Sequence, residues 1–473
     1  MMPRFIAVLD LGKTNAKIAL VDLQSRAEID VATRPNRALP GPPYAHFDTE
    51  GHWAFFLDGL ARLHRDFGVD AISITTHGAC AALLDAKGAL AAPVIDYEEP
   101  ALDDFRADYA ALRPPFSETG APHLPLGLNL GTQIHWQFRR DPGLAARVAH
   151  LVTWPQYWGF RLTGKLATDV TSLGCHTDLW NPYQAKFSGL VEKLGLTGKI
   201  APALRSGDIL GTVTAEIAGA TGLPAKTPVA CGIHDSNASL LPHLLARQGA
   251  FSVVSTGTWV VVMAVGGRQV GLDPARDTLV NVTAFGDALP SARFMGGREY
   301  ELIRQGRPPV AGPADAARVR DAGLMLLPAV VPGCGPYPDH RARWLPSEPQ
   351  DDAAREVALG YYLALMTAEC LALTGGEGPA IIEGPFARNP CFLAMLAAAA
   401  PQPVLTSTSQ TGTAIGAALL FAPDAREGTP PDLPHPVDPA LRSYAAAWRA
   451  RVAAPEADPA TGTKPRSGRC SSH

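Results

Sequence analysis

The chain has 473 residues, more than one hydrophobic core usually organises, so we expect two domains. A hydrophobic content of 47% with 18% charged residues excludes a disordered chain, and the net charge of −4 offers no basic surface to nucleic acid. The sequence holds no uninterrupted apolar run of about 18 residues, so no membrane span is predicted. Seven scattered cysteines without CxxC spacing indicate reduced thiols in a cytoplasmic protein. These features are compatible with small-molecule chemistry and leave a homodimer open.

The first predicted element is a hairpin near the N-terminus. Two strand-like runs, residues 5–9 and 16–21, flank the segment Asp10-Leu11-Gly12-Lys13-Thr14-Asn15. A turn of this composition can present backbone N–H groups, a hydroxyl and one cation to a phosphate. An ordinary hairpin turn is the alternative interpretation.

A helix over residues 53–67 and a strand over 69–75 follow, and the strand ends at Thr76-His77-Gly78. Strand ends followed by glycine are where α/β folds place ligands. A buried core histidine is an equally good interpretation of His77. The run Asp96-Tyr97-Glu98-Glu99 further on is typical of a solvated loop, although it lies beside this potential site.

Residues 113–132 are rich in proline and glycine and predict an irregular connection, followed by helices over 133–139 and 155–162. The GxxxxGK pattern from Gly159 to Lys165 lacks the following Ser or Thr and ends a helix, so we reject a Walker A loop. Residues 168–172 predict a turn.

The stretch Val229 to Leu240 predicts a short strand that ends in the polar group His234-Asp235-Ser236-Asn237 and then a helix. This stretch places one acidic residue, Asp235, at the end of a strand near the middle of the chain. Taken alone, the group is interpreted as a helix start with Asp235 or Ser236 as N-cap.

The second half repeats the first hairpin: residues 250–254 and 259–265 flank Ser255-Thr256-Gly257-Thr258. Two such hairpins predict an internal duplication with two facing phosphate loops. A strand over 380–384 then leads through Pro385-Phe386-Ala387-Arg388-Asn389 into a helix over 391–399, and residues 411–419 predict a tightly packed helix. The span 424–439 is proline-rich, and the tail 454–473 is predicted to be disordered.

The sequence lacks the motifs of several other enzyme classes. No GxGxxG follows a strand, and no GxSxG elbow exists. His234, Asp235 and Ser236 cannot form a triad among themselves, because adjacent side chains point apart. The 13 histidines show no metal-ligand spacing.

With these motifs in place, the chain resembles the FGGY family of carbohydrate kinases over roughly residues 5 to 420. The resemblance rests on Asp10 to Thr14, Gly232 to Asp235, Ser255 to Thr258 and Gly412 to Leu419, in the family's order. It implies an α/β fold of two actin-like (ribonuclease H-like) domains of duplicated topology with a cleft between them. The implied domains are residues 1–243, with the sugar site and first phosphate loop, and 244–440, with the second phosphate loop and adenosine site.

The resemblance also implies roles for individual residues, with ATP and Mg²⁺ as cofactors. Asp235 is implied as the general base, and Asp10 with Asp235 as the Mg²⁺ site, through water. The implied nucleotide contacts are Gly12, Lys13, Thr14, Asn15, Thr256, Gly257, Thr258, Gly384, Phe386 and Asn389. The implied sugar contacts are His77, Gly78, Asp96, Tyr97, His234 and Ser236.

The chain departs from the family pattern at two places. Gly384-Pro385-Phe386 stands where many relatives carry several glycines, so either Phe386 stacks on adenine or the loop has shifted. His77-Gly78-Ala79 replaces the Arg-Glu pair of glycerol kinases, which argues against glycerol. The surroundings of Asp96-Tyr97 and Gly174 to Asp178 resemble the rhamnulose and fuculose kinase branch.

We therefore expect ATP-dependent phosphorylation of a ketose, either a 6-deoxyketohexose such as L-fuculose or L-rhamnulose, or a pentulose, in carbohydrate catabolism. Two alternatives are an actin- or Hsp70-like ATP-dependent interaction protein and a non-catalytic sugar-binding regulator. Polar side chains at His77 and from His234 to Ser236 favour a sugar substrate over the interaction protein.

Overall fold

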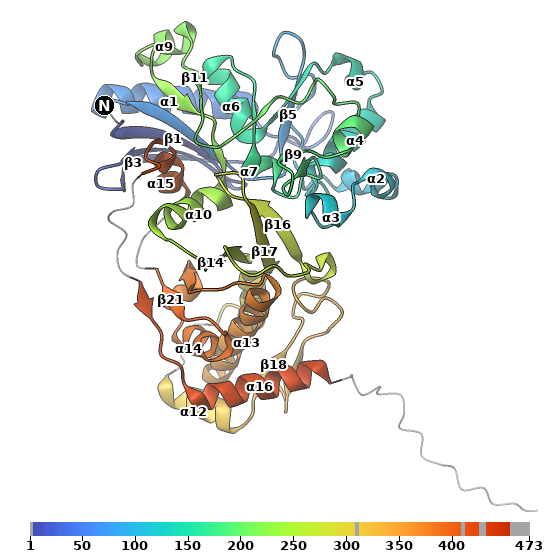
Figure 1. The fold of residues 1–473 in the computed structure, drawn as a ribbon, viewed down its shortest axis with the longest axis vertical. Coiled ribbons are helices and arrows are strands. Elements are labelled where there is room, and N and C mark those ends of the chain that lie inside the picture. The colour runs from blue at the N-terminus through green and yellow to red at the C-terminus, as the bar shows by residue number, and fades with distance from the viewer. Residues whose placement is uncertain (1–2, 308–311, 408–411, 425–431, 455–473) are drawn as a thin grey trace, which may run out of the picture.

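The computed structural model describes residues 3–307, 312–407, 412–424 and 432–454. Two lobes, each built on a mixed sheet, meet around one helix (Figure 1). The predicted disordered tail lies, from residue 455 on, outside the described residues.

The first sheet forms the N-terminal lobe and has the strand order β11-β12-β4-β1-β2-β3, with β13 also pairing with β4. The β1–β2 and β2–β3 pairs are antiparallel, whereas β1–β4 and β4–β12 are parallel. The predicted hairpin at the N-terminus is confirmed. The strands are β1 (Phe5–Leu11), β2 (Asn15–Asp22), β3 (Ala27–Pro35), β4 (Ala71–Thr76), β11 (Ile209–Thr212), β12 (Pro228–Ala230) and β13 (Ile233–His234).

The second sheet repeats this topology in the C-terminal lobe, in the order β16-β17-β15-β14-β20-β21-β22. The β14–β15 and β15–β17 pairs are antiparallel, and β14–β20 and β20–β21 are parallel, as in the first sheet. The predicted duplication is therefore confirmed, with β16 as an added edge strand. The strands are β14 (Phe251–Thr256), β15 (Val260–Val265), β16 (Thr278–Val282), β17 (Ala288–Phe294), β20 (Ala380–Glu383), β21 (Val404–Thr406) and β22 (Leu433–Pro434).

A long insertion between β4 and β11 widens the N-terminal lobe (Figure 1). Residues 168–172 are not the predicted turn, because a short strand runs directly into a helix over Val170–Leu173. The Asp169 carboxylate caps this helix by accepting hydrogen bonds from the amides of Thr171 and Ser172. The insertion contains β5 (Ala81–Leu84), α2 (Arg106–Leu112), α3 (Phe116–Thr119), α4 (Leu130–Arg140), α5 (Leu144–Arg147), β6 (His150–Thr153), α6 (Trp154–Thr163), β7 (Thr168–Asp169), α7 (Val170–Leu173), β8 (Trp180–Asn181), β9 (Lys186–Phe187), α8 (Leu190–Lys193) and β10 (Ala203–Leu204).

Helix α10 (Asp235–Ala246) lies between the two sheets (Figure 1). Its Ala238 and Leu241 pack into the core on one face of the first sheet, while Leu240 packs into the core of the second. The opposite face of the first sheet is covered by α1 (Thr49–Phe67), α6 and α9 (Ala215–Thr221). Since α10 contributes to both cores, the residue at its start is held relative to both lobes.

Helix α15 (Thr413–Ala418) comes late in the chain yet packs on the first sheet, beside α10. The Ser73 hydroxyl on β4 donates to the carbonyl of Ala417 at 2.7 Å. A side chain at Gly416 would begin 1.8 Å from the carbonyl oxygen of Ala238 on α10, so only glycine permits this approach. The chain therefore returns to the N-terminal lobe after building most of the C-terminal one.

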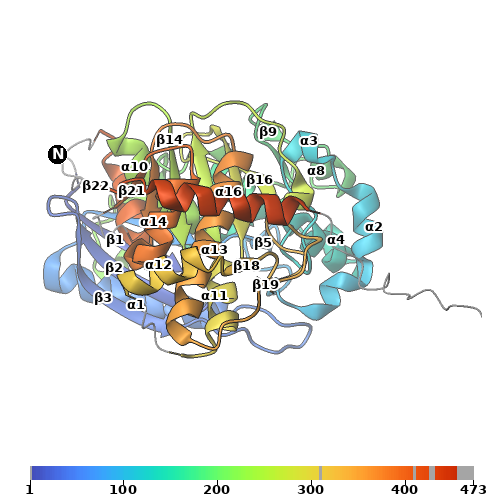
Figure 2. The same cartoon turned by 90° about the horizontal axis from the view of Figure 1, so that it is seen from below.

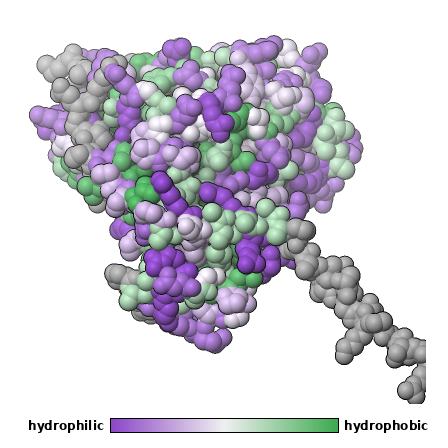
Figure 3. Space-filling model, turned by 60° about the horizontal axis from the view of Figure 1, so that its bottom comes forward, coloured by the Kyte–Doolittle hydropathy of each residue, from purple (hydrophilic) through white to green (hydrophobic). Residues whose placement is uncertain are grey.

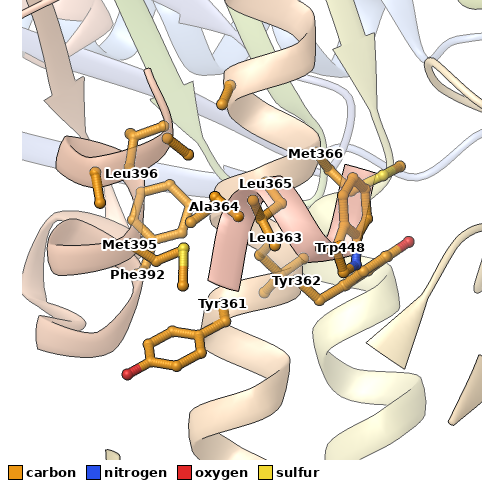
Figure 4. Close-up of a cluster of buried hydrophobic side chains, with 14 of the residues drawn as sticks. Tyr361, Tyr362, Leu363, Ala364, Leu365, Met366, Phe392, Met395, Leu396 and Trp448 are labelled. Carbon is orange, nitrogen blue, oxygen red and sulfur yellow. The ribbon is translucent and has the colours of Figure 1, made fainter. Parts of the chain in front are cut away.

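The core of the C-terminal lobe surrounds α13 (Asp352–Leu373), whose Tyr362 and Met366 are buried among side chains of neighbouring helices (Figure 4). Of the described helices, α13 alone is long and apolar enough to span a membrane, but 78% of its apolar window is buried inside the lobe. Seen from below, α16 lies across this lobe (Figure 2). The remaining elements are α11 (Gly296–Arg304), α12 (Pro313–Asp321), β18 (Met325–Leu327), β19 (Arg343–Leu345), α14 (Pro390–Ala399) and α16 (Pro439–Ala453).

On the face shown in Figure 3, hydrophobic residues are scattered among hydrophilic ones. Single exposed residues such as Leu302 and Val437 are ordinary on a protein surface.

Glu299 on α11 is fully buried and makes the C-terminal lobe sensitive to pH. Its carboxyl accepts hydrogen bonds from the Tyr362 hydroxyl at 2.9 Å and the Val331 amide at 3.1 Å, but burial outweighs them and raises its pKa from 4.5 to about 7. Because the folded-state pKa exceeds the unfolded one, the folded state holds this proton more tightly, and stability falls as the pH rises from about 4.5 to 7.

We therefore expect Glu299→Gln to gain roughly 2–3 kcal/mol in free energy of unfolding, relative to the unmodified chain, between pH 5 and pH 8. Urea unfolding at the two pH values measures this gain. Glu301→Gln, at an exposed position of the same helix, is the control. A Glu299→Gln difference that does not change with pH would contradict the prediction.

Candidate active site

Three residues predicted for the site, the base Asp235, the Mg²⁺ residue Asp10 and the sugar residue His77, meet at one edge of the first sheet. Strands β1, β4 and β13 are parallel neighbours, and the register aligns Leu11 with Thr76 and Thr76 with His234. Asp10, His77 and Asp235 are therefore brought together where the carboxyl ends of these strands meet, the usual ligand-binding edge of such sheets.

Asp10 is buried at the end of β1, with its carboxylate held from two sides. Its Oδ2 accepts a hydrogen bond from the Thr413 hydroxyl at 2.5 Å and lies 3.3 Å from the Lys17 ammonium. Burial raises the pKa of Asp10, and the nearby negative charge of Asp235 raises it further, against the opposing effect of Lys17. The two carboxylates are thus close enough to interact electrostatically.

Asp235 is the first residue of α10, and its side chain is 31% exposed. Its Oδ1 accepts a hydrogen bond from the Ser236 amide at 2.6 Å, which orients the carboxylate. The predicted N-cap at Asp235 or Ser236 is wrong: the cap position is His234, whose side chain makes no capping bond. The register of β13 sets this start, since His234 still pairs with Thr76 as strand.

His77 and His234 line the site beside Asp235. The Nδ1 of His77 donates to the Gly78 carbonyl at 2.9 Å, which leaves Nε2 as a buried acceptor without a hydrogen-bond partner. Burial lowers the pKa of His77 to about 4, so its ring stays neutral. A side chain at Gly78 would begin 2.9 Å from the Nε2 of His234, so glycine keeps this side of the site open.

Cys175 lies in the segment Gly174 to Asp178 noted in the sequence, but it was not predicted to be a site residue. Its Sγ lies 3.4 Å from the Nε2 of His234, and that nitrogen lies 3.2 Å from Oδ1 of Asp235. Burial opposes charge on both Cys175 and His234, but His176 and His234 lower the pKa of the thiol, while Cys175 and Asp235 raise that of His234. The arrangement favours a thiolate paired with an imidazolium beside Asp235.

The side chain of Lys13 contacts residues predicted to bind the sugar. Its ammonium forms an ion pair with Asp96 and lies 3.1 Å from Glu98. It also lies 4.5 Å from the ring centre of Tyr97. Asp96 and Tyr97 are thus joined to the first phosphate loop through Lys13.

The two glycine turns differ in length. The Gly12 amide donates to the Asn15 carbonyl at 2.9 Å, with Thr14 and Asn15 exposed at the tip. In the second turn, the Gly257 amide donates to the Trp259 carbonyl at 2.9 Å, which makes this turn one residue tighter. Each turn follows the strand that comes first in the chain within its sheet, β1 or β14, as the duplication predicts.

A pocket of about 720 Å³ in the C-terminal lobe brings together several predicted nucleotide contacts. Gly257, Thr258, Phe386 and Asn389 all line it. Tyr300 also lines it, although no sequence pattern indicated a role for this residue. The full lining is Gly257, Thr258, Gly297, Arg298, Tyr300, Glu301, Arg304, Glu356, Pro385, Phe386, Arg388, Asn389, Pro390 and Cys391.

The Gly384 loop is anchored from the second phosphate loop. The Thr256 hydroxyl donates to the Glu383 carbonyl and accepts from the Phe386 amide at 3.1 Å. Gly384 has φ of +81°, and a side chain there would begin 2.1 Å from the Thr256 carbonyl oxygen. Phe386 is only 6% exposed, so little of its ring is left to stack on adenine. Asn389 caps α14 by accepting from the Phe392 amide.

The residues at the sheet edge fit Mg²⁺. Among the described residues, no group of three or more His, Cys, Asp and Glu side chains forms a closed metal site. Asp10 and Asp235 instead offer two carboxylates close enough to interact, and Mg²⁺ is commonly held by one or two carboxylates together with substrate phosphates.

Comparisons with known proteins agree with this architecture. Residues 5–242 match the N-terminal domain of the FGGY family of carbohydrate kinases, and residues 248–430 match the FGGY carbohydrate kinase C-terminal domain. A solved carbohydrate kinase from Novosphingobium aromaticivorans superposes with a TM-score of 0.87 at 36% identity, covering 96% of this chain and 99% of that one. A xylulose kinase from Rhodospirillum rubrum, at 21% identity and a TM-score of 0.77 over 95% and 98% of the two chains, shares the fold.

Among curated relatives, the L-fuculokinase of Salmonella typhi is 28% identical over 275 residues, or 56% of this chain and 57% of that protein. The rhamnulokinase of Bacteroides thetaiotaomicron is 26% identical over 273 residues, or 55% and 54%. The chain thus spans little more than half the length of the curated relatives it matches.

The duplicated sheets, the shared helix and the paired carboxylates define a two-domain protein of the actin-like class, as the sequence predicted. The chain belongs to the FGGY family of carbohydrate kinases.

Proposed function

We propose that the chain is an ATP-dependent kinase that phosphorylates a hydroxyl group of a ketose. The observation that carries this proposal is the position of Asp235, a partly exposed carboxylate at the start of the helix between the lobes, beside Asp10. Among the relatives, the L-fuculokinase and the rhamnulokinase favour a 6-deoxyketohexose such as L-fuculose or L-rhamnulose, and the xylulose kinase makes a pentulose the next choice. The cytoplasm, where ATP and such sugars are available, is the proposed location.

In this mechanism Asp235 accepts the proton of the sugar hydroxyl as its oxygen attacks the γ-phosphorus. Phosphoryl transfer depends mainly on positioning and on neutralising charge, so one base suffices. Asp10 and Asp235 would hold Mg²⁺, which neutralises phosphate charge when bound. Thr14 and Asn15 on one side and Thr258 on the other would present amides and hydroxyls to the phosphates. Gly12, Thr256 and Gly257 already donate their amide or hydroxyl hydrogens within the protein and would shape the two loops.

The sugar would lie on the N-terminal side of Asp235. There the unpartnered Nε2 of His77 can accept one hydroxyl hydrogen, and His234, Ser236, Asp96 and Tyr97 offer further polar atoms. The adenosine would occupy the 720 Å³ pocket beside Gly257, Phe386 and Asn389. Closure of the lobes would exclude water from the phosphates and limit wasteful ATP hydrolysis.

A coupled assay of ADP release over a panel of ketoses and polyols tests the proposal. We expect ADP release to require one sugar of the ketose group and Mg²⁺. ADP release that no sugar stimulates would refute the kinase proposal and favour an ATP-dependent interaction protein. Sugar binding by calorimetry without any turnover would favour a non-catalytic regulator.

A further inference from the structure

We propose that Lys13 belongs to the sugar site instead of binding the nucleotide's phosphates, and that its ammonium, neutralised by Asp96 and Glu98, makes this site selective for uncharged sugars. The inference rests on the proposed kinase function and assigns a substrate class to it. It differs from the role expected from the sequence, which counts Lys13 among the phosphate contacts.

The first support is the set of charges around Lys13. Asp96 is buried and lies 83 residues away in the chain, yet its carboxylate contacts the Lys13 ammonium directly. Glu98, at the more exposed rim, lies 3.1 Å from the same ammonium. Asp96 is fixed in turn, since its Oδ1 accepts the Glu98 amide at 3.0 Å. Two carboxylates thus pair with the Lys13 ammonium, which a phosphate contact would require to be free.

The second support is the aromatic surface under Lys13. Its ammonium lies 5.3 Å from the ring centre of Phe47 and 4.5 Å from that of Tyr97, within the range of cation–π attraction. His77 packs against both rings, with centres 5.2 Å from Phe47 and 5.7 Å from Tyr97. Lys13 and the rings of Phe47, Tyr97 and His77 therefore form one wall of the site. On this wall the Nε2 of His77 has no hydrogen-bond partner in the protein.

The charge balance of this wall decides the substrate class. Asp96 and Glu98 carry two negative charges against the single positive charge of Lys13, and Asp235 adds a further negative charge within electrostatic range of Tyr97 and His77. Carboxylates and a neutral imidazole nitrogen accept hydrogen bonds from hydroxyl groups. A carboxylate on the sugar would instead be repelled, because Lys13 is already paired with Asp96 and Glu98. The His234 imidazole beside it is likewise paired, with Cys175 and Asp235.

Lys13→Met tests the first part, because methionine keeps most of the unbranched side chain and removes the charged ammonium. We expect the KM for the preferred ketose to rise at least about tenfold, the value of one hydrogen bond to a charged group. The affinity for ADP with Mg²⁺, measured by calorimetry, should stay within about twofold. Lys87→Met, in an exposed turn, is the matched control and should change neither value.

The double variant Asp96→Asn with Glu98→Gln tests the second part by releasing the Lys13 ammonium. We expect the ratio of kcat/KM for a sugar acid such as gluconate to that for the ketose to rise at least about tenfold. Adding Lys13→Met to the double variant should abolish this gain. An unmodified chain that phosphorylates the sugar acid as well as the ketose would overturn the selectivity.

The two proposals fail in different ways. Weaker ADP binding by Lys13→Met, with an unchanged KM for the sugar, would overturn the sugar-site assignment and restore the phosphate role. Absence of turnover by the unmodified chain with every sugar would refute the proposed kinase. The calorimetric comparison would then still decide whether Lys13 contacts the nucleotide.

Discussion

Replacement of Asp235 by asparagine is expected to lower kcat by about 10² to 10⁴, because an amide cannot accept the proton of the attacking hydroxyl. Asparagine has the same size, and its Oδ1 can still accept the Ser236 amide, so the start of α10 should survive. The coupled ADP assay measures kcat, and calorimetry with ADP should show a dissociation constant close to that of the unmodified chain.

Asp58→Asn, at an exposed position in α1, is the matched control for this charge change and should leave kcat unaltered. A kcat for Asp235→Asn within tenfold of the unmodified value would contradict the base assignment. Weakened ADP binding together with lost turnover would instead indicate that Asp235 acts mainly in holding Mg²⁺.

Gly416→Ala is expected to damage stability and catalysis together. Its Cβ would lie 1.8 Å from the backbone oxygen of Ala238, so α15 and α10 must move apart. Overpacking of this kind commonly costs about 1–3 kcal/mol. Ala238 is one helical turn from Asp235, and a displacement of the base by about 1 Å can lower kcat on the order of a hundredfold.

Thermal unfolding and the ADP assay measure the two effects of Gly416→Ala. Gly219→Ala in α9 is the control, because a side chain there meets no atom within 4 Å and should slightly stabilise the helix. If Gly416→Ala matched this control in both measurements, the close contact between α10 and α15 would have no role in holding Asp235.

Local patterns predicted the frame of the molecule well. The apolar runs on either side of Gly12 and Gly257 became β1–β2 and β14–β15, because strand formation follows from side chains adjacent in the chain. The polar residues after these strands and after β4 meet at sheet edges, as parallel topology requires. Asp10 and Asp235 could therefore be brought together from the sequence and the family resemblance.

Contacts between distant side chains could not be predicted in this way. Nothing near Lys13 in the sequence indicates that Asp96 neutralises it, because that contact depends on how the loop after β5 folds over the first hairpin. Cys175 reaches His234 across 59 residues, and Tyr300 enters the nucleotide pocket from α11. Thr413 was part of a recognised motif, yet its bond to Asp10 crosses 403 residues.

The return of α15 to the first sheet has a consequence for biosynthesis. One face of that sheet, with Ile6 and Val8, is covered by α10 and by the helix that begins only at Thr413. During translation this face of the N-terminal lobe therefore stays incompletely covered while the residues between Ala246, at the end of α10, and Thr413 emerge from the ribosome. Exposed apolar surface of this kind is what chaperones bind, so the nascent chain is expected to depend on them until α15 docks.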